Sequence, residues 1–419
     1  MIEYEWKQIN KRRLFDDLDK YASYGKDERG GITRPSFSKA DIEVRKMFIQ
    51  ELEDLGLEVK VDGIANIWGT LKGNGKKSGA IVIGSHLDTV PNGGKYDGAL
   101  GVLIAKEVIC CLKERNLTLD HDIEIVSFTA EESNDFGLST LGSRTFVGKL
   151  TEEDLFDVAD SSGQLLRDAL KVVGGDLESI KEMEQMRKDK KVFIEVHIEQ
   201  GQRLENKNIS VAIVNNLVGM YRCHVSVIGE SNHSGTTMME DRNDALTAAS
   251  KMISVVETIC KSDETDLVGT VGKLDVHPNA VNIIPGKVEF FFEIRGESQS
   301  RMEEVIQGIE REWKSILKDR DVIITKNVIL EQVPIQLDNE IVAVLEDTAK
   351  QIDEPYLKLP SMAIHDAAHM AASSKSAMIF VKSVGGKSHC PEEYSEPKDI
   401  DAAANLLLQG VLEIDRRFD

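Results

Sequence analysis

The sequence predicts an α/β fold: an open, mostly parallel sheet with helices between its strands, interrupted by a smaller α+β domain. Three observations support this. The length of 419 residues exceeds the roughly 250–300 at which single hydrophobic cores stop growing, so we expect two domains. Short apolar runs alternate with a run of helical length in the first half of the chain. From about residue 213 the pattern changes to half-buried strands and amphipathic helices.

The first domain is predicted from one amphipathic helix and a set of apolar runs. Lys39–Leu57 places Val44, Phe48 and Leu52 on one side at helical spacing. Leu100–Leu112 is apolar and long enough for a buried helix. Four short apolar runs are typical of buried strands. They are Ala80–Gly84, Ile123–Phe128, Val192–Ile198 and Ala377–Val381.

Between residues 213 and 329 the predicted order is β-α-β-β-α-β, which is the ferredoxin-like arrangement. The six predicted elements are Tyr221–Ile228, Asp244–Cys260, Thr270–Val276, Lys287–Ile294, Arg301–Leu317 and Asp321–Val328. We therefore expect residues 1–212 and 330–419 to form one domain, and residues 213–329 to form a domain inserted into it.

Composition excludes several classes of protein. The chain has 51 Lys and Arg against 72 Asp and Glu, a formal net charge of −21, which argues against nucleic acid and against an anionic membrane surface. The polar N-terminal segment has no apolar signal region, and no run reaches the roughly 18 apolar residues of a membrane span. The five cysteines form no CxxC pair. A cytoplasmic protein is the expectation.

Residues that can bind a metal follow the predicted strands. In open α/β sheets, ligands bind at the carboxyl ends of strands. Imidazoles and carboxylates of this kind suit Zn, Co, Mn or Ni. A carboxylate can also bridge two metals about 3.5–4 Å apart. The candidates are His86 and Asp88, Asp97 in a glycine-rich loop, Glu131 and Glu132, His197 and Gln200, and His389.

Each of these residues also has an ordinary interpretation. A histidine at a strand end is usually solvated, an adjacent glutamate pair is usually surface charge, and a glycine-rich loop is usually only a turn. The metal-site interpretation is favoured because four strand ends bring such residues to what can be one edge of one sheet.

The motifs GSHLDTV, NGGKYDGALG, TAEES, HIEQG, NHSGTTM, NAVNIIPG, EIRG and GGKSHCPE resemble the hydantoinase/carbamoylase subfamily of binuclear metallo-amidohydrolases. That subfamily includes N-carbamoyl-L-amino acid hydrolases, allantoate amidohydrolases and β-ureidopropionase-like enzymes, within the superfamily of aminoacylases and zinc exopeptidases. The resemblance runs from about residue 40 to the C-terminus. It implies a zinc-exopeptidase-like catalytic domain, an inserted lid or dimerisation domain, a homodimer, and two divalent ions per subunit (Zn, or Mn, Co or Ni).

The same resemblance implies roles for individual residues. His86 and His197 would bind one metal, and Glu132 and His389 the other, with Asp97 bridging them. Glu131 would be the general base. Asp88 would orient His86, as carboxylates commonly do for metal-bound imidazoles.

Further roles concern the substrate, a small molecule with a carboxylate. His233 would reach the developing oxyanion, often from the partner subunit. Asn282 and Arg295 would bind the substrate carboxylate, and Gln200 the substrate amide. His365 and Asp366 would stand behind the ligands.

The implied reaction cleaves the carbamoyl C–N bond of an N-carbamoyl-L-amino acid and releases the amino acid, ammonia and carbon dioxide. Allantoate amidohydrolase and N-acyl-amino acid amidohydrolase or dipeptidase remain alternatives. A non-catalytic binding protein on a degenerate scaffold is disfavoured, because every predicted ligand and the base are present.

Departures from the family pattern leave the identity of the substrate side chain open. They are acidic Asp135 where a basic residue is frequent, Met238 where proline is usual, Ile364 where glycine is usual, and Cys390 where asparagine is common.

Overall fold

The chain divides into two compact units in a computed structural model that describes residues 8–318 and 320–419. The large unit comprises the chain through Asn215 together with Leu337–Leu359 and Ile364–Asp419. The small unit comprises Asn216–Gln336 and Pro360–Ala363. The small unit is thus inserted into the sequence of the large one.

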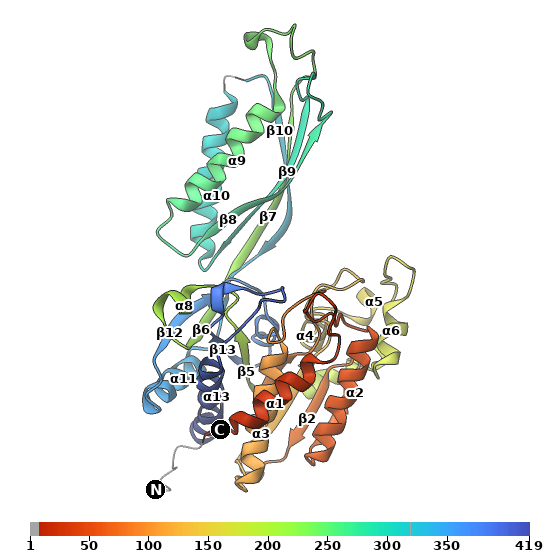
Figure 1. Cartoon of the computed structure of the whole chain (residues 1–419), viewed down its shortest axis with the longest axis vertical. Coiled ribbons are helices and arrows are strands. Elements are labelled where there is room, and N and C mark those ends of the chain that lie inside the picture. The colour runs from red at the N-terminus through yellow and green to blue at the C-terminus, as the bar shows by residue number, and fades with distance from the viewer. Residues whose placement is uncertain (1–7, 319) are drawn as a thin grey trace. The chain divides into compact units, whose positions relative to one another are not determined.

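The large unit is built on a nine-stranded sheet in the order β1-β2-β4-β3-β5-β13-β6-β11, with β12 paired to β6 (Figure 1). The central strands β4, β3, β5 and β13 are parallel to one another, and the outer pairs are antiparallel. The predicted α/β class with a mostly parallel sheet is therefore confirmed. The strands are β1 Glu58–Val61, β2 Ile67–Leu71, β3 Ala80–His86, β4 Asp122–Phe128, β5 Lys190–Ile198, β6 Val211–Leu217, β11 Ile335–Gln336, β12 Tyr356–Ser361 and β13 Lys375–Val381.

The four central strands contain the four apolar runs predicted as strands. Every residue of β3 is buried. Strands of a parallel sheet are covered on both faces, which is why their sequences are almost continuously apolar. The helices of the large unit are α1 Lys11–Ala22, α2 Lys39–Asp54, α3 Ala99–Glu114, α4 Leu141–Phe146, α5 Glu152–Leu155, α6 Leu166–Val172, η1 Leu177–Glu182, α7 Met183–Lys188, α8 Arg203–Lys207, α11 Asn339–Gln351, α12 Asp366–Met370, η3 Val384–Gly386 and α13 Pro397–Arg417.

Helix α3 is the central helix of the large unit and packs on β3, β4 and β5. It is buried from Ala99 to Leu112, as a helix without a polar face must be. Its close approach to the sheet depends on Gly101. A Cβ atom there would lie 2.1 Å from the carbonyl oxygen of Val196 and 2.9 Å from the Cβ of Ser85.

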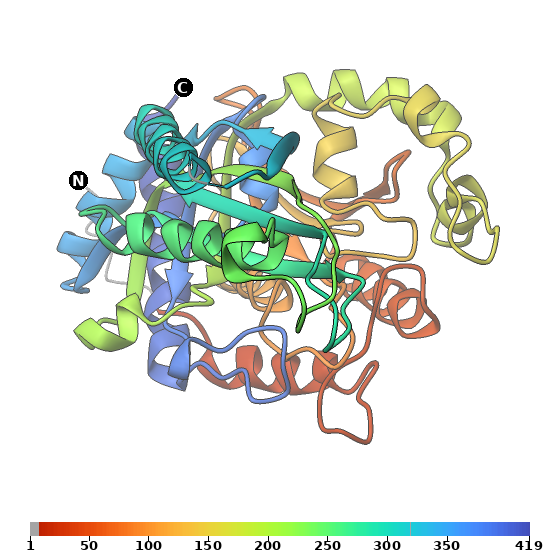
Figure 2. The same ribbon diagram turned by 90° about the horizontal axis from the view of Figure 1, so that it is seen from above.

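The small unit has a four-stranded antiparallel sheet in the order β10-β7-β9-β8. Helices α9 and α10 lie side by side against this sheet (Figures 1 and 2). Strand β9 alternates buried and half-buried residues, so Phe290 and Phe292 pack against Trp313 of α10, whereas Glu293 and Arg295 lie on the other face. The elements are β7 Gly219–Ile228, η2 Met239–Asp241, α9 Ala245–Lys261, β8 Val268–His277, β9 Lys287–Gly296, α10 Gln299–Leu317 and β10 Ile323–Gln332.

No helix of residues 8–318 and 320–419 has both the length and the apolar character needed to cross a membrane.

We predict that Gly101→Ala destabilises the large unit. A new Cβ would meet a backbone oxygen, which cannot move away by a rotamer change, so overpacking should cost about 1–3 kcal/mol. Over most of this range the cost exceeds the gain of about 1 kcal/mol expected from replacing a helical glycine by alanine. Thermal unfolding measures the change. The matched control is Gly308→Ala in α10, where the nearest atoms lie at 3.8 Å and stability should rise. A melting temperature of Gly101→Ala at or above the wild-type value would contradict this packing argument.

Candidate metal centre

His86 is the last residue of β3, and its ring is fixed by the chain around it. Its Nδ1–H donates to the carbonyl oxygen of Asp88 at 3.0 Å, so Nε2 keeps a lone pair. The backbone of Gly98 covers the ring, because a Cβ at that position would lie 2.2 Å from the imidazole. Gly98 also has a φ of +64°, which favours glycine. Both constraints fix the direction in which Nε2 points.

His197 on β5 is held in the same tautomer as His86. Its Nδ1–H donates to the carbonyl oxygen of Ile198 at 3.0 Å, and its ring is buried. The two rings lie 5.9 Å apart between centroids. Two parallel strands, β3 and β5, therefore present two imidazole Nε2 atoms at the same edge of the sheet.

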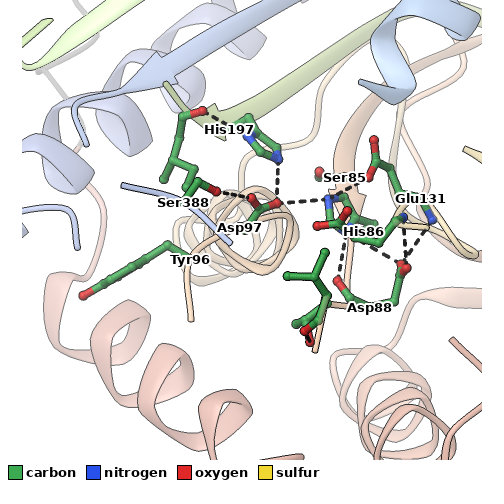
Figure 3. Close-up of polar contacts among 12 residues, drawn as sticks. Ser85, His86, Asp88, Tyr96, Asp97, Glu131, His197 and Ser388 are labelled. Carbon is green, nitrogen blue, oxygen red and sulfur yellow. Dashed lines mark hydrogen bonds and ion pairs between the residues drawn. The ribbon is translucent and has the colours of Figure 1, made fainter. Parts of the chain in front are cut away.

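The carboxylate of Asp97 lies between the imidazoles of His86 and His197, as Figure 3 shows, and it also faces the imidazole of His389. Its Oδ1 is 3.5 Å from Nε2 of His86 and 3.2 Å from Nε2 of His197. Its Oδ2 is 3.5 Å from Nε2 of His389. Each carboxylate oxygen thus faces a different set of nitrogens, which is the arrangement of a bridging ligand.

Glu132 and His389 complete a second group around Asp97. Nε2 of His389 is 3.2 Å from Oε1 of Glu132. His389 has a left-handed backbone with a φ of +57°, and half of its side chain is exposed. The two groups of ligands are therefore a buried one and one that is open to solvent.

The residues present fit divalent metal ions. The potential ligand atoms of His86, Asp97 and His197 lie within 4.8 Å of one another, as do those of Asp97, Glu132 and His389. Nε2 of His86 is buried and has no hydrogen-bond partner among the described residues. Burial disfavours a charge on His86, but Glu131 and the neighbouring aspartates raise the pKa of His86 well above its ordinary value. The site therefore favours positive charge, and its nitrogen and oxygen donors suit borderline metals.

The adjacent residues Glu131 and Glu132 are directed apart by the chain. Ala130 turns the backbone with a φ of +55°, and the carboxylate of Asp88 accepts the amide protons of Glu131 and Glu132 at 3.3 and 3.1 Å. Glu132 then reaches His389, whereas Oε2 of Glu131 lies 3.7 Å from Nε2 of His86. Burial raises the pKa of Glu131 well above its ordinary value. Glu131 is thus a carboxyl beside the ligands that can exchange a proton.

Asp88 acts on its neighbours in two ways. The contact of 3.0 Å to His86 comes from the backbone carbonyl of Asp88, and the Asp88 carboxylate lies farther away, at 3.6 Å. The side chain instead holds the glutamate pair and accepts a hydrogen bond from Ser36 at 2.9 Å.

Gln200, His365 and Asp366 also lie at this centre. Nε2 of Gln200 donates to Oδ2 of Asp97 at 2.8 Å. The buried ring of His365 lies 4.3 Å from that of His197 between centroids, with the two ring planes tilted by 54°. Asp366 begins α12 and is fully buried, and burial raises the pKa of its carboxyl.

The remaining predicted residues belong to the small unit. His233 is exposed, and its Nδ1 accepts the amide protons of Gly235 and Thr236 at 3.1 and 3.2 Å. Asn282 is exposed on a neighbouring segment, where its carbonyl accepts the amide proton of Ser234 at 3.1 Å. Arg295 donates from Nε to Glu293 at 2.6 Å and from Nη1 to the carbonyl oxygen of Met362 at 2.8 Å.

Three further residues of the site were not found from the sequence. Glu195 lies on β5 two residues before His197, and it accepts hydrogen bonds from Ser85 Oγ at 2.7 Å and from the amide of Ala367 at 2.9 Å. A carboxylate inside an otherwise apolar strand could have indicated that Glu195 has polar partners near the site. Ser388 and Glu393 contact Asp97 or its backbone from the loop that carries His389, and no sequence spacing indicates that contact.

A carboxylate shared by two groups of potential metal ligands, with a buried glutamate beside it, is the arrangement expected of a metal-dependent hydrolase. The chain belongs to the Peptidase family M20/M25/M40, whose model matches residues 82–413. It is 34% identical to N-carbamoyl-L-amino acid amidohydrolase of Geobacillus stearothermophilus, over 97% of this chain and 99% of that one. It is also 34% identical to allantoate amidohydrolase of Bacillus subtilis, over 95% and 96% of the two chains.

Solved structures agree with these relatives. An amidase of the hydantoinase/carbamoylase family from Burkholderia multivorans superposes with a TM-score of 0.90 at 28% identity, covering 97% of this chain and 98% of that one. The predicted family resemblance is confirmed, as is the predicted class of hydrolases acting on C–N bonds other than peptide bonds.

We predict that divalent metal raises the melting temperature of chelator-treated protein, because binding to the folded state alone stabilises it. At a free metal concentration of 100 Kd the gain should be about 2.7 kcal/mol. Asp97→Asn should abolish most of this rise, since it removes the carboxylate shared by both ligand groups. The control is Asp62→Asn, a buried carboxylate bonded to Asn66 and Trp68. Asp62→Asn should lower the melting temperature of the metal-free protein and keep the increase that metal causes. An undiminished rise in Asp97→Asn would rule out its role as a ligand.

Proposed function

We propose that the protein is a metal-dependent amidohydrolase that cleaves the ureido C–N bond of an N-carbamoyl-L-amino acid, with two divalent ions in the site. The observation that carries the proposal is the position of Asp97 between two groups of ligands, with Glu131 beside them. The relative from Geobacillus stearothermophilus, which aligns over nearly the full length of both chains, supports the substrate class.

Glu131 is the proposed general base. When bound, the metal ions polarise the substrate carbonyl and lower the pKa of a water molecule. Glu131 takes the proton of the attacking water on its carboxylate and delivers it to the leaving nitrogen. The nearly buried position of its side chain, which is 10% exposed, suits this role because burial raises the pKa of the carboxyl, which strengthens it as a proton acceptor.

His233 is the proposed donor to the developing oxyanion. Its Nδ1 accepts two backbone amide protons, so the ring proton resides on Nε2, which can donate outward. Removing a comparable donor costs roughly 10²–10³ in rate in studied enzymes. In the resembled subfamily this histidine often comes from the partner subunit. We therefore propose a homodimer, and a monomeric mass in solution would contradict it. The proposed location is the cytoplasm.

Arg295 and Asn282 are the proposed ligands of the substrate carboxylate. A guanidinium binds a carboxylate through two parallel hydrogen bonds. Glu293 and the carbonyl of Met362 hold the guanidinium of Arg295 in one orientation, which lowers the entropy lost on binding. Gln200, whose amide nitrogen is bonded to Asp97, is proposed to contact the substrate amide with its remaining polar atom.

Allantoate is the second candidate substrate, because the allantoate amidohydrolase of Bacillus subtilis is as similar in sequence as the carbamoylase. Both reactions release ammonia from a ureido group. They differ in the rest of the substrate, so the product formed together with ammonia distinguishes them.

We predict that metal-reconstituted protein releases ammonia and free amino acid from N-carbamoyl-L-amino acids. A panel assay follows both products for carbamoyl amino acids, allantoate and N-acyl-amino acids. Ammonia from allantoate alone would identify the second candidate. Activity towards none of the three groups would refute the proposed substrate class.

We predict that Glu131→Gln keeps its metal and loses turnover by about 10²–10⁴-fold, the range typical of general acid–base catalysis. The matched control is the neighbouring substitution Glu132→Gln, which should instead lower the metal content, because Glu132 is a ligand candidate. Elemental analysis and the ammonia assay separate the two effects. Full activity of Glu131→Gln would show that another group is the base.

A further inference from the structure

The carboxylate of Glu393 holds the backbone that carries Asp97. Oε1 of Glu393 accepts the amide protons of Tyr96 at 2.9 Å and of Asp97 at 3.0 Å. The residue is 5% exposed, although it lies in a loop four residues beyond His389. A buried carboxyl group of this kind is tolerated where hydrogen bonds replace those that it made to water. These two amides provide such bonds.

Ser388 links the side chains of Asp97 and Glu393. Its Oγ lies 2.8 Å from Oδ2 of Asp97 and 3.2 Å from Oε2 of Glu393 (Figure 3 shows the contact with Asp97). Nε2 of Gln200 donates to the same oxygen of Asp97 at 2.8 Å. Asp97 is therefore restrained at its backbone by Glu393 and at its carboxylate by Ser388 and Gln200.

Gly94 leaves the space that Glu393 occupies. A Cβ atom at this glycine would lie 2.1 Å from Oε1, 2.2 Å from Cδ and 2.4 Å from Cβ of Glu393. The glycine-rich loop of Asp97 and the loop of His389 thus fit against each other through one buried carboxylate. The carboxyl group of Glu393 is therefore enclosed between the two loops, where it holds the segment that carries Asp97.

We propose that Glu393 is a positioning residue of the metal centre: it fixes Asp97 between the two ligand groups by holding the amides of Tyr96 and Asp97, with Ser388 as the link between the two carboxylates. The inference rests on the proposed function only in that Asp97 is taken as a metal ligand. Groups that orient metal ligands typically change metal affinity by 10–100-fold when they are removed.

The test compares Zn²⁺ affinity, by competition with a chromophoric chelator, and the absorption spectrum of the Co²⁺-loaded full-length protein. Glu393→Ala should weaken Zn²⁺ binding by about 10–100-fold and alter the Co²⁺ spectrum. Glu393→Gln should recover most of the affinity, because its amide oxygen can still accept both backbone protons. Gly94→Ala should weaken binding like Glu393→Ala, since it displaces the carboxylate without changing its chemistry.

The matched control is Asp415→Ala. Asp415 is also a buried carboxylate of the large unit that accepts two consecutive amides, those of Asp120 and His121, but it lies on α13 and outside the ligand groups. This variant should lower the melting temperature and leave Zn²⁺ affinity unchanged. Thermal unfolding of all variants shows how much stability each one loses.

Wild-type Zn²⁺ affinity in Glu393→Ala would overturn the inference. An affinity loss in Glu393→Gln or in Asp415→Ala as large as that in Glu393→Ala would overturn it as well. If Glu393→Ala does not fold, Glu393→Gln and Gly94→Ala decide between these outcomes. A wild-type protein that binds no metal would overturn both this inference and the proposed function. A wild-type protein that binds metal and hydrolyses its substrate, with no effect of Glu393→Ala on affinity, would overturn the inference alone.

Discussion

The contact on which the site depends is the one between Asp97 and the imidazoles of His86, His197 and His389. Burial alone would raise the pKa of this carboxyl, yet the three imidazoles hold it well below its ordinary value. Asp97 is thus kept ionised although its own side chain is almost fully buried. An ionised carboxylate between two groups of potential ligands is also what a shared metal ligand would require.

The parallel sheet explains how residues far apart in sequence form this site. Strands β3, β4, β5 and β13 run in the same direction, so the residues at or after their carboxyl ends meet at one edge. Each strand contributes a different group: His86 from β3, the glutamate pair after β4, His197 from β5 and His389 beyond β13. Because α3 packs closely on the sheet through Gly101, the loop before that helix brings Asp97 to the same edge.

Much of this arrangement could be predicted from the sequence. The apolar runs locate the four central strands because buried parallel strands have almost no polar residues, and the strand ends then locate the candidate ligands. The contacts of Asp88 with two amides and of Glu393 with the Asp97 loop could not be predicted. They join loops whose backbone path is set by residues such as Ala130 and His389 with positive φ, and no periodicity describes such loops. Glu195 could have been found, since a carboxylate on a buried strand needs partners.

The glycine-rich segment that runs from the loop before α3 into the first turn of this helix shows that the ordinary interpretation of a motif can be wrong. Taken alone, NGGKYDGALG is typical of a turn. Three of its four glycines are instead places where another group comes too close for a side chain: Glu393 at Gly94, the ring of His86 at Gly98 and the backbone of β5 at Gly101. Each contact restrains one end or the other of the segment that carries Asp97. The glycines therefore make this loop rigid, because they allow it to be packed on several sides at once, and a rigid loop is what a carboxylate shared between two ligand groups requires.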